Sequence, residues 1–263
     1  MPSSMIADRY DAFLLDLDGV LYRGADPVPA AAESLARLRS MGKRIAFVTN
    51  NSGRTPDVVA ERLRSVGVQA RSDEVETSAL TTAAVLATRG VEHAFVVGET
   101  GLVEALTRAG VQVLAGQPER VDVVVVGWDR DADYEKLRTA SVLVQQGAEL
   151  IATNPDASFP AADGTRWPGA GALLAAIETT TGVRGEVIGK PHPPILLAAL
   201  ERAGGGRPLI IGDRLDTDIA GAAGLGWDSM LVLTGIDGRE EASAAVLRPT
   251  YVAENLEALF VDA

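Results

Sequence analysis

The chain has 263 residues, of which 47% are hydrophobic and 23% charged. This composition is typical of a globular protein with one large or two modest domains, and it excludes a disordered chain. There are 36 Asp and Glu against 24 Lys and Arg, a formal net charge of −12, so we expect no binding of nucleic-acid polymers and no adhesion to anionic lipid. Cysteine is absent and there are only two histidines, which leaves oxygen ligands, and hard cations such as magnesium, for any metal site.

The N-terminal segment, MPSSMIADRYDAF, has neither the basic region nor the apolar stretch of a signal peptide. The longest apolar runs, such as residues 123–126, are far shorter than a membrane-spanning helix. We therefore expect a cytoplasmic protein that does not associate with membranes.

Short β-branched runs alternate with helical patterns at both ends of the chain. The strands expected there cover residues 12–17, 44–48, 208–211 and 229–233, with a last strand near residue 251. The helices expected there cover residues 29–41, 56–66 and 216–225, with a closing helix at the end of the chain. This rhythm is typical of a parallel sheet covered by helices on both faces.

The middle of the chain contains a second set of the same elements. Its predicted strands are residues 94–97, 111–114, 121–127 and 150–153, and its predicted helices are residues 102–109 and 134–146. We therefore predict an α/β fold with a Rossmann-like parallel-sheet core and an inserted α/β domain. The predicted boundaries give residues 1–78 and 185–263 to the core and residues 79–184 to the insertion.

Acidic and hydroxyl side chains follow three of the predicted strands of the core. They are Asp16 and Asp18, Thr49 and Asn50, and Asp213 and Asp218. Ligands of open α/β sheets bind at the carboxyl ends of the strands, so these groups should converge on one edge. Taken singly, each motif also fits an ordinary turn or a helix cap, but those readings do not explain the convergence.

Asp16 and Asp18 are two positions apart, so on an extended chain both should face one pocket. Two neighbouring carboxylates repel each other unless a cation or a proton separates them. A divalent ion could hold one while the other acts as an acid or base. Lys190 is one of only three lysines in an arginine-rich chain, which suggests a compact point charge, although chance could also place it there.

These motifs together resemble the haloacid dehalogenase superfamily of phosphotransferases, and the likeness extends over nearly the whole chain. The motifs, in the order of that superfamily, are DLDGV at residues 16–20, TNN at 49–51, Lys190, and GDRLDTD at 212–218. The long insertion, with ATNPD at 152–156 and PGAGAL at 168–173, resembles the large α/β cap of the NagD-type and nitrophenylphosphatase-like subgroup. GDRLDTDI together with LVLTG resembles the glycerol phosphate phosphatases of this subgroup.

The resemblance implies a catalytic role for three residues. Asp16 would be the nucleophile that forms an aspartyl-phosphate. Asp18 would be the acid that protonates the leaving oxygen and later the base that activates water. Lys190 would offset the negative charge near Asp16.

The resemblance also implies a magnesium ion (Mg2+) held by Asp16, Asp213 and the backbone carbonyl of Asp18, with Asp218 orienting the ligands and water. Thr49, Asn50 and Asn51 would bind the phosphoryl group. Asn154 and Asp156, in the cap, would contact the rest of the substrate, although Asn-Pro-Asp also favours a plain turn. The implied partner is a small phosphorylated metabolite, and cap-mediated homodimers are common in this subgroup.

The pair of aspartates distinguishes activities within the superfamily. Dehalogenases lack the second Asp and transport ATPases carry DKTGT, so Asp18 favours a hydrolase of small phosphomonoesters such as glycerol 3-phosphate, sugar phosphates or nucleoside monophosphates. A phosphotransferase or phosphomutase with the same pair is an alternative. A non-catalytic sensor of phosphorylated metabolites is another, and the intact Asp18 and Lys190 argue against it.

The insertion carries two further expectations. Residues 129–133 are predicted to form a solvated turn, and Trp128, Trp167 and Trp227 are expected to pack rather than to bind ligand.

Overall fold

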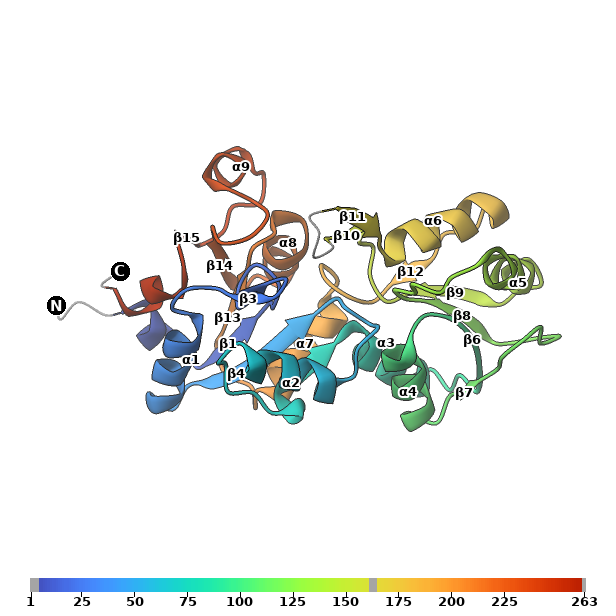
Figure 1. The fold of residues 1–263 in the computed structure, drawn as a ribbon, viewed down its shortest axis with the longest axis horizontal. Coiled ribbons are helices and arrows are strands. Elements are labelled where there is room, and N and C mark those ends of the chain that lie inside the picture. Colours follow the sequence, from blue (N-terminus) through green and yellow to red (C-terminus); the bar gives the residue numbers. More distant parts are fainter. Residues whose placement is uncertain (1–4, 161–164, 262–263) are drawn as a thin grey trace. The chain divides into compact units, whose positions relative to one another are not determined.

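The computed structural model describes residues 5–160 and 165–261 (Figure 1). The chain divides into two compact units, here called the core unit and the inserted unit. The core unit comprises Met1–Thr49, Asp57–Glu76 and Lys190–Ala263, and the inserted unit comprises Asn50–Pro56 and Thr77–Gly189. The domain boundaries predicted at residues 78 and 184 stay a prediction.

The core unit is built on a six-stranded sheet in the order β15-β14-β13-β1-β4-β5. Its strands are β1 (Ala12–Leu15), β4 (Arg44–Thr49), β5 (Val75–Thr77), β13 (Pro208–Gly212), β14 (Asp228–Val232) and β15 (Tyr251–Ala253). Strand β1 pairs in parallel with β13 and with β4, and Leu15 lies opposite both Ile211 and Phe47. This register brings the carboxyl ends of the three central strands to the same level.

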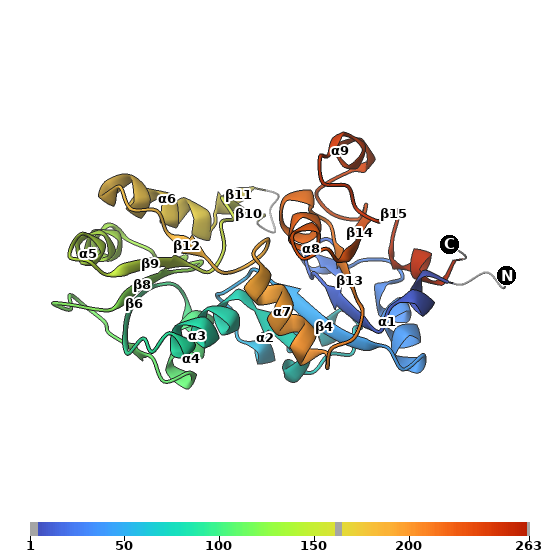
Figure 2. The same cartoon turned by 180° about the vertical axis from the view of Figure 1, so that it is seen from behind.

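Helices cover both faces of this sheet (Figures 1 and 2). They are α1 (Ala31–Ser40), α2 (Pro56–Ser65), α7 (Pro193–Arg202), α8 (Ala220–Gly224) and α9 (Arg239–Ala244), with 3-10 helices at Ile6–Arg9, Ser72–Glu74 and Leu256–Phe260. A short hairpin, β2 (Tyr22–Arg23) and β3 (Asp26–Pro27), follows β1.

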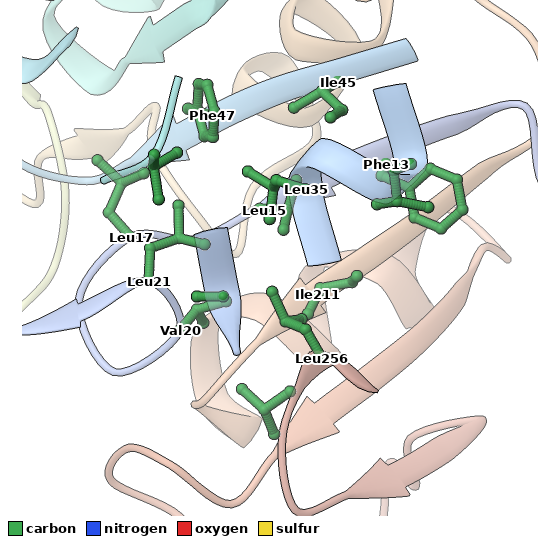
Figure 3. Packing of buried hydrophobic residues seen from close by; sticks show 14 of the residues in the cluster. Phe13, Leu15, Leu17, Val20, Leu21, Leu35, Ile45, Phe47, Ile211 and Leu256 are labelled. Carbon is green, nitrogen blue, oxygen red and sulfur yellow. The ribbon is translucent and has the colours of Figure 1, made fainter. Parts of the chain in front are cut away.

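Side chains of β1 alternate between the two faces, as the period of two of a strand requires. Phe13 and Leu15 pack with Leu35 of α1 on one face, where Figure 3 shows them. Leu14 packs with Leu196 of α7 on the other. Because both faces are buried, the strand is continuously apolar up to Leu15, and the first polar side chain after it is Asp16.

The inserted unit contains a five-stranded parallel sheet in the order β12-β9-β8-β6-β7. Its strands are β6 (His93–Val97), β7 (Gln112–Val113), β8 (Val123–Val126), β9 (Glu149–Ala152) and β12 (Glu186–Val187), with an antiparallel hairpin of β10 (Ser158–Pro160) and β11 (Arg166–Pro168). Helices α3 (Ser78–Thr88) and α4 (Thr100–Arg108) cover one face, and α5 (Tyr134–Gln145) and α6 (Ala170–Thr181) cover the other.

The predicted parallel α/β architecture is confirmed, and several details of the prediction are wrong. The first strand ends at Leu15 rather than at residue 17, because the chain turns there to begin the Asp16 loop. The helix predicted at 216–225 is a π-helical turn, Leu215–Ile219, followed by α8.

Two predictions about side chains of the inserted unit are also wrong. Within the predicted solvated turn at residues 129–133, Arg130, Asp131 and Asp133 are exposed as expected, but Asp129 is buried and paired with Lys136 at 2.7 Å. Trp167 is 44% exposed rather than packed, because its hairpin lies at the surface of the unit. Trp128 is buried as expected and stacks on Phe159 with 4.5 Å between ring centroids.

Candidate active site

Four of the predicted site residues, Asp16, Asp213, Asp218 and Lys190, lie together at the carboxyl edge of the core sheet. Asp16 follows β1, and its backbone N–H donates to the carbonyl of Ile211 at 2.8 Å. Asp213 follows β13 directly and is buried. Asp218 lies in the π-helical turn after β13 and is also buried. Parallel strands in register therefore bring together side chains that are about 200 residues apart in sequence, as expected at the carboxyl edge of an open α/β sheet.

Lys190 is the cation of this cluster. Its side chain is 4% exposed, and its Nζ donates to Asp16 Oδ1 and, at 2.7 Å, to Asp218 Oδ1. A third, longer contact of 3.5 Å reaches the carbonyl of Val48 in β4. A buried ammonium is stable only with such partners, so Lys190 and the two carboxylates form one charged unit.

Crowding and burial perturb the acids of the cluster. Burial raises the pKa of Asp16 well above its usual range; Lys190 opposes this, and Asp218 and Asp213 add to it. Burial, together with the charge of Asp218, raises the pKa of Asp213 to about 7. Burial would lower the pKa of Lys190, but Asp16 and Asp218 more than compensate and raise it. The acids therefore need more positive charge than Lys190 supplies.

This donor set fits a divalent cation. One carboxylate oxygen from each of Asp16, Asp213 and Asp218 lies within 4.8 Å of the others. Three carboxylates and one ammonium leave an excess of two negative charges, which a divalent ion would neutralise. Carboxylate oxygens are the ligands that magnesium and calcium prefer.

Asp18 lies apart from these three carboxylates. Its pKa is raised by burial, while the charge of Arg62 and the backbone N–H groups of Gly24 and Gly19 oppose that shift by stabilising the carboxylate. A raised pKa favours the protonated form that an acid catalyst needs. The Asp18 side chain thus has a different environment from Asp16, two residues before it, which is the condition for two different roles.

Two glycines let the loops approach Asp213. Gly19 has φ +80°, and a Cβ built on it would lie 2.3 Å from Asp213 Oδ2. A Cβ on Gly235 would lie 1.9 Å from the same oxygen. The Asp213 carboxylate accepts a hydrogen bond from Ile236 N at 2.9 Å, and Thr234 Oγ1 donates to the carbonyl of Gly19 at 2.6 Å. The loop after β14 therefore holds Asp213 in place, a function that sequence reasoning missed.

Thr49 is the last residue of β4 and is buried in the core unit. The other predicted binding residues lie in the inserted unit, where Asn50, Asn154 and Asp156 form one group. Asn50 Nδ2 donates to Asp156 Oδ2 at 3.2 Å, and Asn154 Nδ2 donates to the carbonyl of Asn50 at 2.7 Å. Asn154 Oδ1 also accepts from Asp156 N at 3.1 Å, so the predicted Asn-Pro-Asp turn is formed as well.

Asn51 has a local role in the structure. Its Oδ1 accepts a hydrogen bond from Gly53 N at 2.9 Å, which closes a turn at the start of the inserted unit. Ser78, which sequence reasoning did not select, donates its Oγ to the Asn50 carbonyl at 2.7 Å. The signal for Ser78 would have been its position directly after a short strand, where polar groups converge.

No helix within the described residues has both the length and the apolar character needed to cross a membrane.

A buried ammonium among carboxylates, at the carboxyl edge of a parallel sheet, is an arrangement suited to an enzyme that transfers an anionic group. Comparison with known proteins specifies the class. Residues 13–112 match the family model described as haloacid dehalogenase-like hydrolase, and residues 187–259 match a second model of haloacid dehalogenase hydrolase type.

Relatives extend the match over the whole chain. The acid sugar phosphatase of Staphylococcus aureus is 39% identical over 251 residues, which cover 94% of this chain and 96% of the relative. A crystal structure of the glycerol phosphate phosphatase of Mycobacterium tuberculosis in complex with magnesium is 35% identical, with a TM-score of 0.93, and covers 99% of this chain and 79% of that one. A 4-nitrophenylphosphatase from Thermotoga maritima is 34% identical, with a TM-score of 0.90, over 97% of this chain and 98% of that one. The chain belongs to the haloacid dehalogenase-like hydrolase family and is a phosphatase.

Proposed function

We propose that this protein is a magnesium-dependent phosphomonoesterase that acts on small phosphorylated metabolites through an aspartyl-phosphate on Asp16. The observation that carries the proposal is the contact of buried Lys190 with both Asp16 and Asp218, beside Asp213. A structural ion pair would need one acid for one lysine. Three acids beside one lysine carry more negative charge than the lysine can neutralise. Such a site can bind a divalent cation, and with that cation it can bind an anionic substrate.

In the first half of the reaction, Asp16 Oδ attacks phosphorus and the bond from phosphorus to the alcohol oxygen breaks. Asp18, protonated at the start, gives its proton to that oxygen, so a neutral alcohol leaves. In the second half, Asp18 takes a proton from water, and the water oxygen attacks the phosphorus. The bond between phosphorus and Asp16 then breaks, which releases inorganic phosphate and restores Asp16 as a carboxylate and Asp18 in its protonated form.

Charge is the main obstacle to this reaction, because a carboxylate must approach a dianion. Lys190 is fixed by two carboxylates and so lies at Asp16 without further reorganisation. Magnesium would be held by Asp16, Asp213 and the Asp18 backbone carbonyl, with Asp218 orienting these ligands. When bound, it supplies positive charge that offsets the repulsion between carboxylate and phosphoryl oxygens.

Substrate recognition is assigned to polar residues at or after the ends of strands β4 and β9. Thr49, Asn50 and Asn51 would bind the phosphoryl oxygens, and Asn154 and Asp156 would contact the leaving group. Sugar phosphates and glycerol 3-phosphate are the proposed substrates, since the relatives include an acid sugar phosphatase and a glycerol phosphate phosphatase. A homodimer formed through the inserted unit stays a prediction.

The test is phosphate release from a panel of phosphomonoesters, with and without magnesium, for the wild type and for Asp16→Asn and Asp18→Asn. We expect magnesium-dependent turnover that falls by at least about a thousandfold in Asp16→Asn. Exchange of phosphate between esters without net release would instead indicate a phosphotransferase. Unchanged turnover in Asp16→Asn, with the fold intact, would overturn the mechanism.

A further inference from the structure

The hairpin that follows Asp18 has little packing of its own. Residues 23–27 are exposed, and only the Tyr22 side chain, which is half-buried, packs against the core cluster. The turn at Gly24 has φ +52°, with no atom within 4 Å of a Cβ built there. A two-stranded hairpin of this size is not stable alone, so something outside it must fix its position.

Arg62, on helix α2, provides two of the hairpin's contacts. Its Nη2 donates to the carbonyl of Gly24, and its guanidinium lies over the ring of Tyr22, 5.1 Å from the centroid. Arg62 therefore binds the hairpin at its turn and at its first strand. The planar guanidinium can stack and donate at the same time, which an ammonium cannot do.

The hairpin in turn adjoins the loop of Asp18, because Asp18 and Tyr22 form an isolated β-bridge. The backbone N–H groups of Gly24 and Gly19 stabilise the Asp18 carboxylate and so oppose the rise of its pKa. The backbone N–H of Gly19 donates to the carbonyl of Tyr22 at 2.8 Å, so the loop and the hairpin share a hydrogen bond. Arg62 thus contacts Gly24 through its carbonyl and stacks on Tyr22, which forms a β-bridge with Asp18. Displacing the hairpin would therefore disturb the backbone around Asp18.

We propose that Arg62 is a positioning residue, which holds the β2–β3 hairpin so that its backbone fixes the Asp18 carboxyl for proton transfer to the leaving group. The proposal rests on the proposed role of Asp18 as the acid. Arg62 does not touch the reacting atoms in this account. It acts through its contacts with Gly24 and Tyr22, and its charge also stabilises the Asp18 carboxylate. It does so from a helix whose sequence position gives no indication of the site.

A loss of proton donation slows esters with different leaving groups to different degrees. A general loss of folded protein would slow all esters equally. An alkyl phosphate such as glycerol 3-phosphate expels a strongly basic alkoxide, so it depends on the acid. 4-Nitrophenyl phosphate expels a stable phenolate and depends on the acid far less. A misplaced Asp18 should therefore slow the first ester much more than the second.

The experiment compares kcat/KM for these two esters in the wild type, Arg62→Ala, Arg62→Lys and Asp18→Asn. For Arg62→Ala we expect a fall of about tenfold or more with glycerol 3-phosphate and less than about threefold with 4-nitrophenyl phosphate. Arg62→Lys should give a smaller loss of the same kind. Arg64→Ala is the matched control, because Arg64 lies on the same helix and donates to the carbonyl of Ala70, away from the hairpin; it should leave both values unchanged.

Hydrogen exchange supplies a second readout, independent of activity. The amides of Gly19 and Val28 are bonded to the carbonyls of Tyr22 and Leu21, so Arg62→Ala should speed exchange in residues 19–28 and leave β1 protected. If Arg62→Ala does not fold, Tyr22→Leu removes the stacking partner from the other side and should give the same ester selectivity.

Equal losses for both esters, or no loss, in folded Arg62→Ala would overturn the positioning role. Asp18→Asn keeps the two proposals distinct. If Asp18→Asn fails to discriminate between the esters, the proposed role of Asp18 is wrong. If Asp18→Asn discriminates and Arg62→Ala does not, only the inference about Arg62 is wrong.

Discussion

Replacing Lys190 with methionine tests whether the buried charges of the site depend on one another. Methionine fills a similar volume and removes the ammonium. It leaves Asp218, whose side chain is 2% exposed, and Asp16, 14% exposed, without their cationic partner. Neither carboxylate can then recover its lost interaction from bulk water, so the folded state loses stability.

The magnitude follows from the cost of leaving one partner of a buried pair uncompensated, about 3–5 kcal/mol. The pKa of Lys190 is raised in the folded protein, so its contribution is fully present below the unfolded-state pKa of about 10.4 and is lost only as the pH rises through the higher folded-state value. Near neutral pH the whole effect should be visible.

The assay is urea unfolding of the metal-free protein near neutral pH, alongside phosphate release with magnesium. Lys136→Met is the control, because Lys136 pairs with buried Asp129 in the inserted unit but is itself 30% exposed. We expect it to lose about 1–3 kcal/mol of stability and to keep its activity. Lys190→Met should lose more stability and nearly all activity. An unfolding free energy within about 1 kcal/mol of the wild type would refute the reasoning.

Three further variants test the loops, the core and the metal ligands. Gly19→Ala should lose about 1–3 kcal/mol in a thermal melt, because its φ is +80° and its Cβ would lie 2.3 Å from Asp213 Oδ2; an unchanged melt would contradict that contact. Phe13→Ala should cost about 3–5 kcal/mol by urea unfolding, since Phe13 is fully buried beside Leu35, and a loss below about 1 kcal/mol would show the core to be less tightly packed than described. Asp213→Asn should weaken magnesium binding by at least about tenfold in calorimetry, whereas an unaltered affinity would remove Asp213 from the ligand set.

The site was predictable from sequence because its residues lie where apolar runs stop. Asp16 and Asp213 each follow a continuously buried strand, and the parallel register that joins Leu15 to Ile211 then determines that they meet. Lys190 was identified by residue usage, and the structure pairs it with Asp16. The family resemblance supplied the roles, which geometry alone does not assign.

Two long helices of the inserted unit escaped prediction. Helix α3 (Ser78–Thr88) is rich in Ala, Leu and Val, with small Thr side chains that are also buried, so it lacks the polar face that reveals a helical period. Helix α6 (Ala170–Thr181) has the same character. Such helices are stabilised by packing against the sheet and the neighbouring helices. The local sequence pattern does not show this packing.

Side-chain contacts outside the recognised motifs could not be predicted. Asp129 was predicted to lie in a solvated turn, yet it is buried and forms an ion pair with Lys136 of α5. From the sequence alone, Arg62 is an ordinary charged residue on an amphipathic helix. Its proximity to Gly24 depends on how α2 packs beside the sheet, which is a property of the fold rather than of the sequence around it.

The covalent intermediate is the central claim, and trapping it is the most direct test. The enzyme would be mixed with excess glycerol 3-phosphate and magnesium, quenched with acid within milliseconds, and analysed by mass spectrometry of the peptide that contains Asp16. We expect one added phosphoryl group on Asp16, removed by hydroxylamine and absent in Asp16→Asn. Turnover with no phosphoryl group on Asp16 at any quench time, or with the group on another residue, would contradict it.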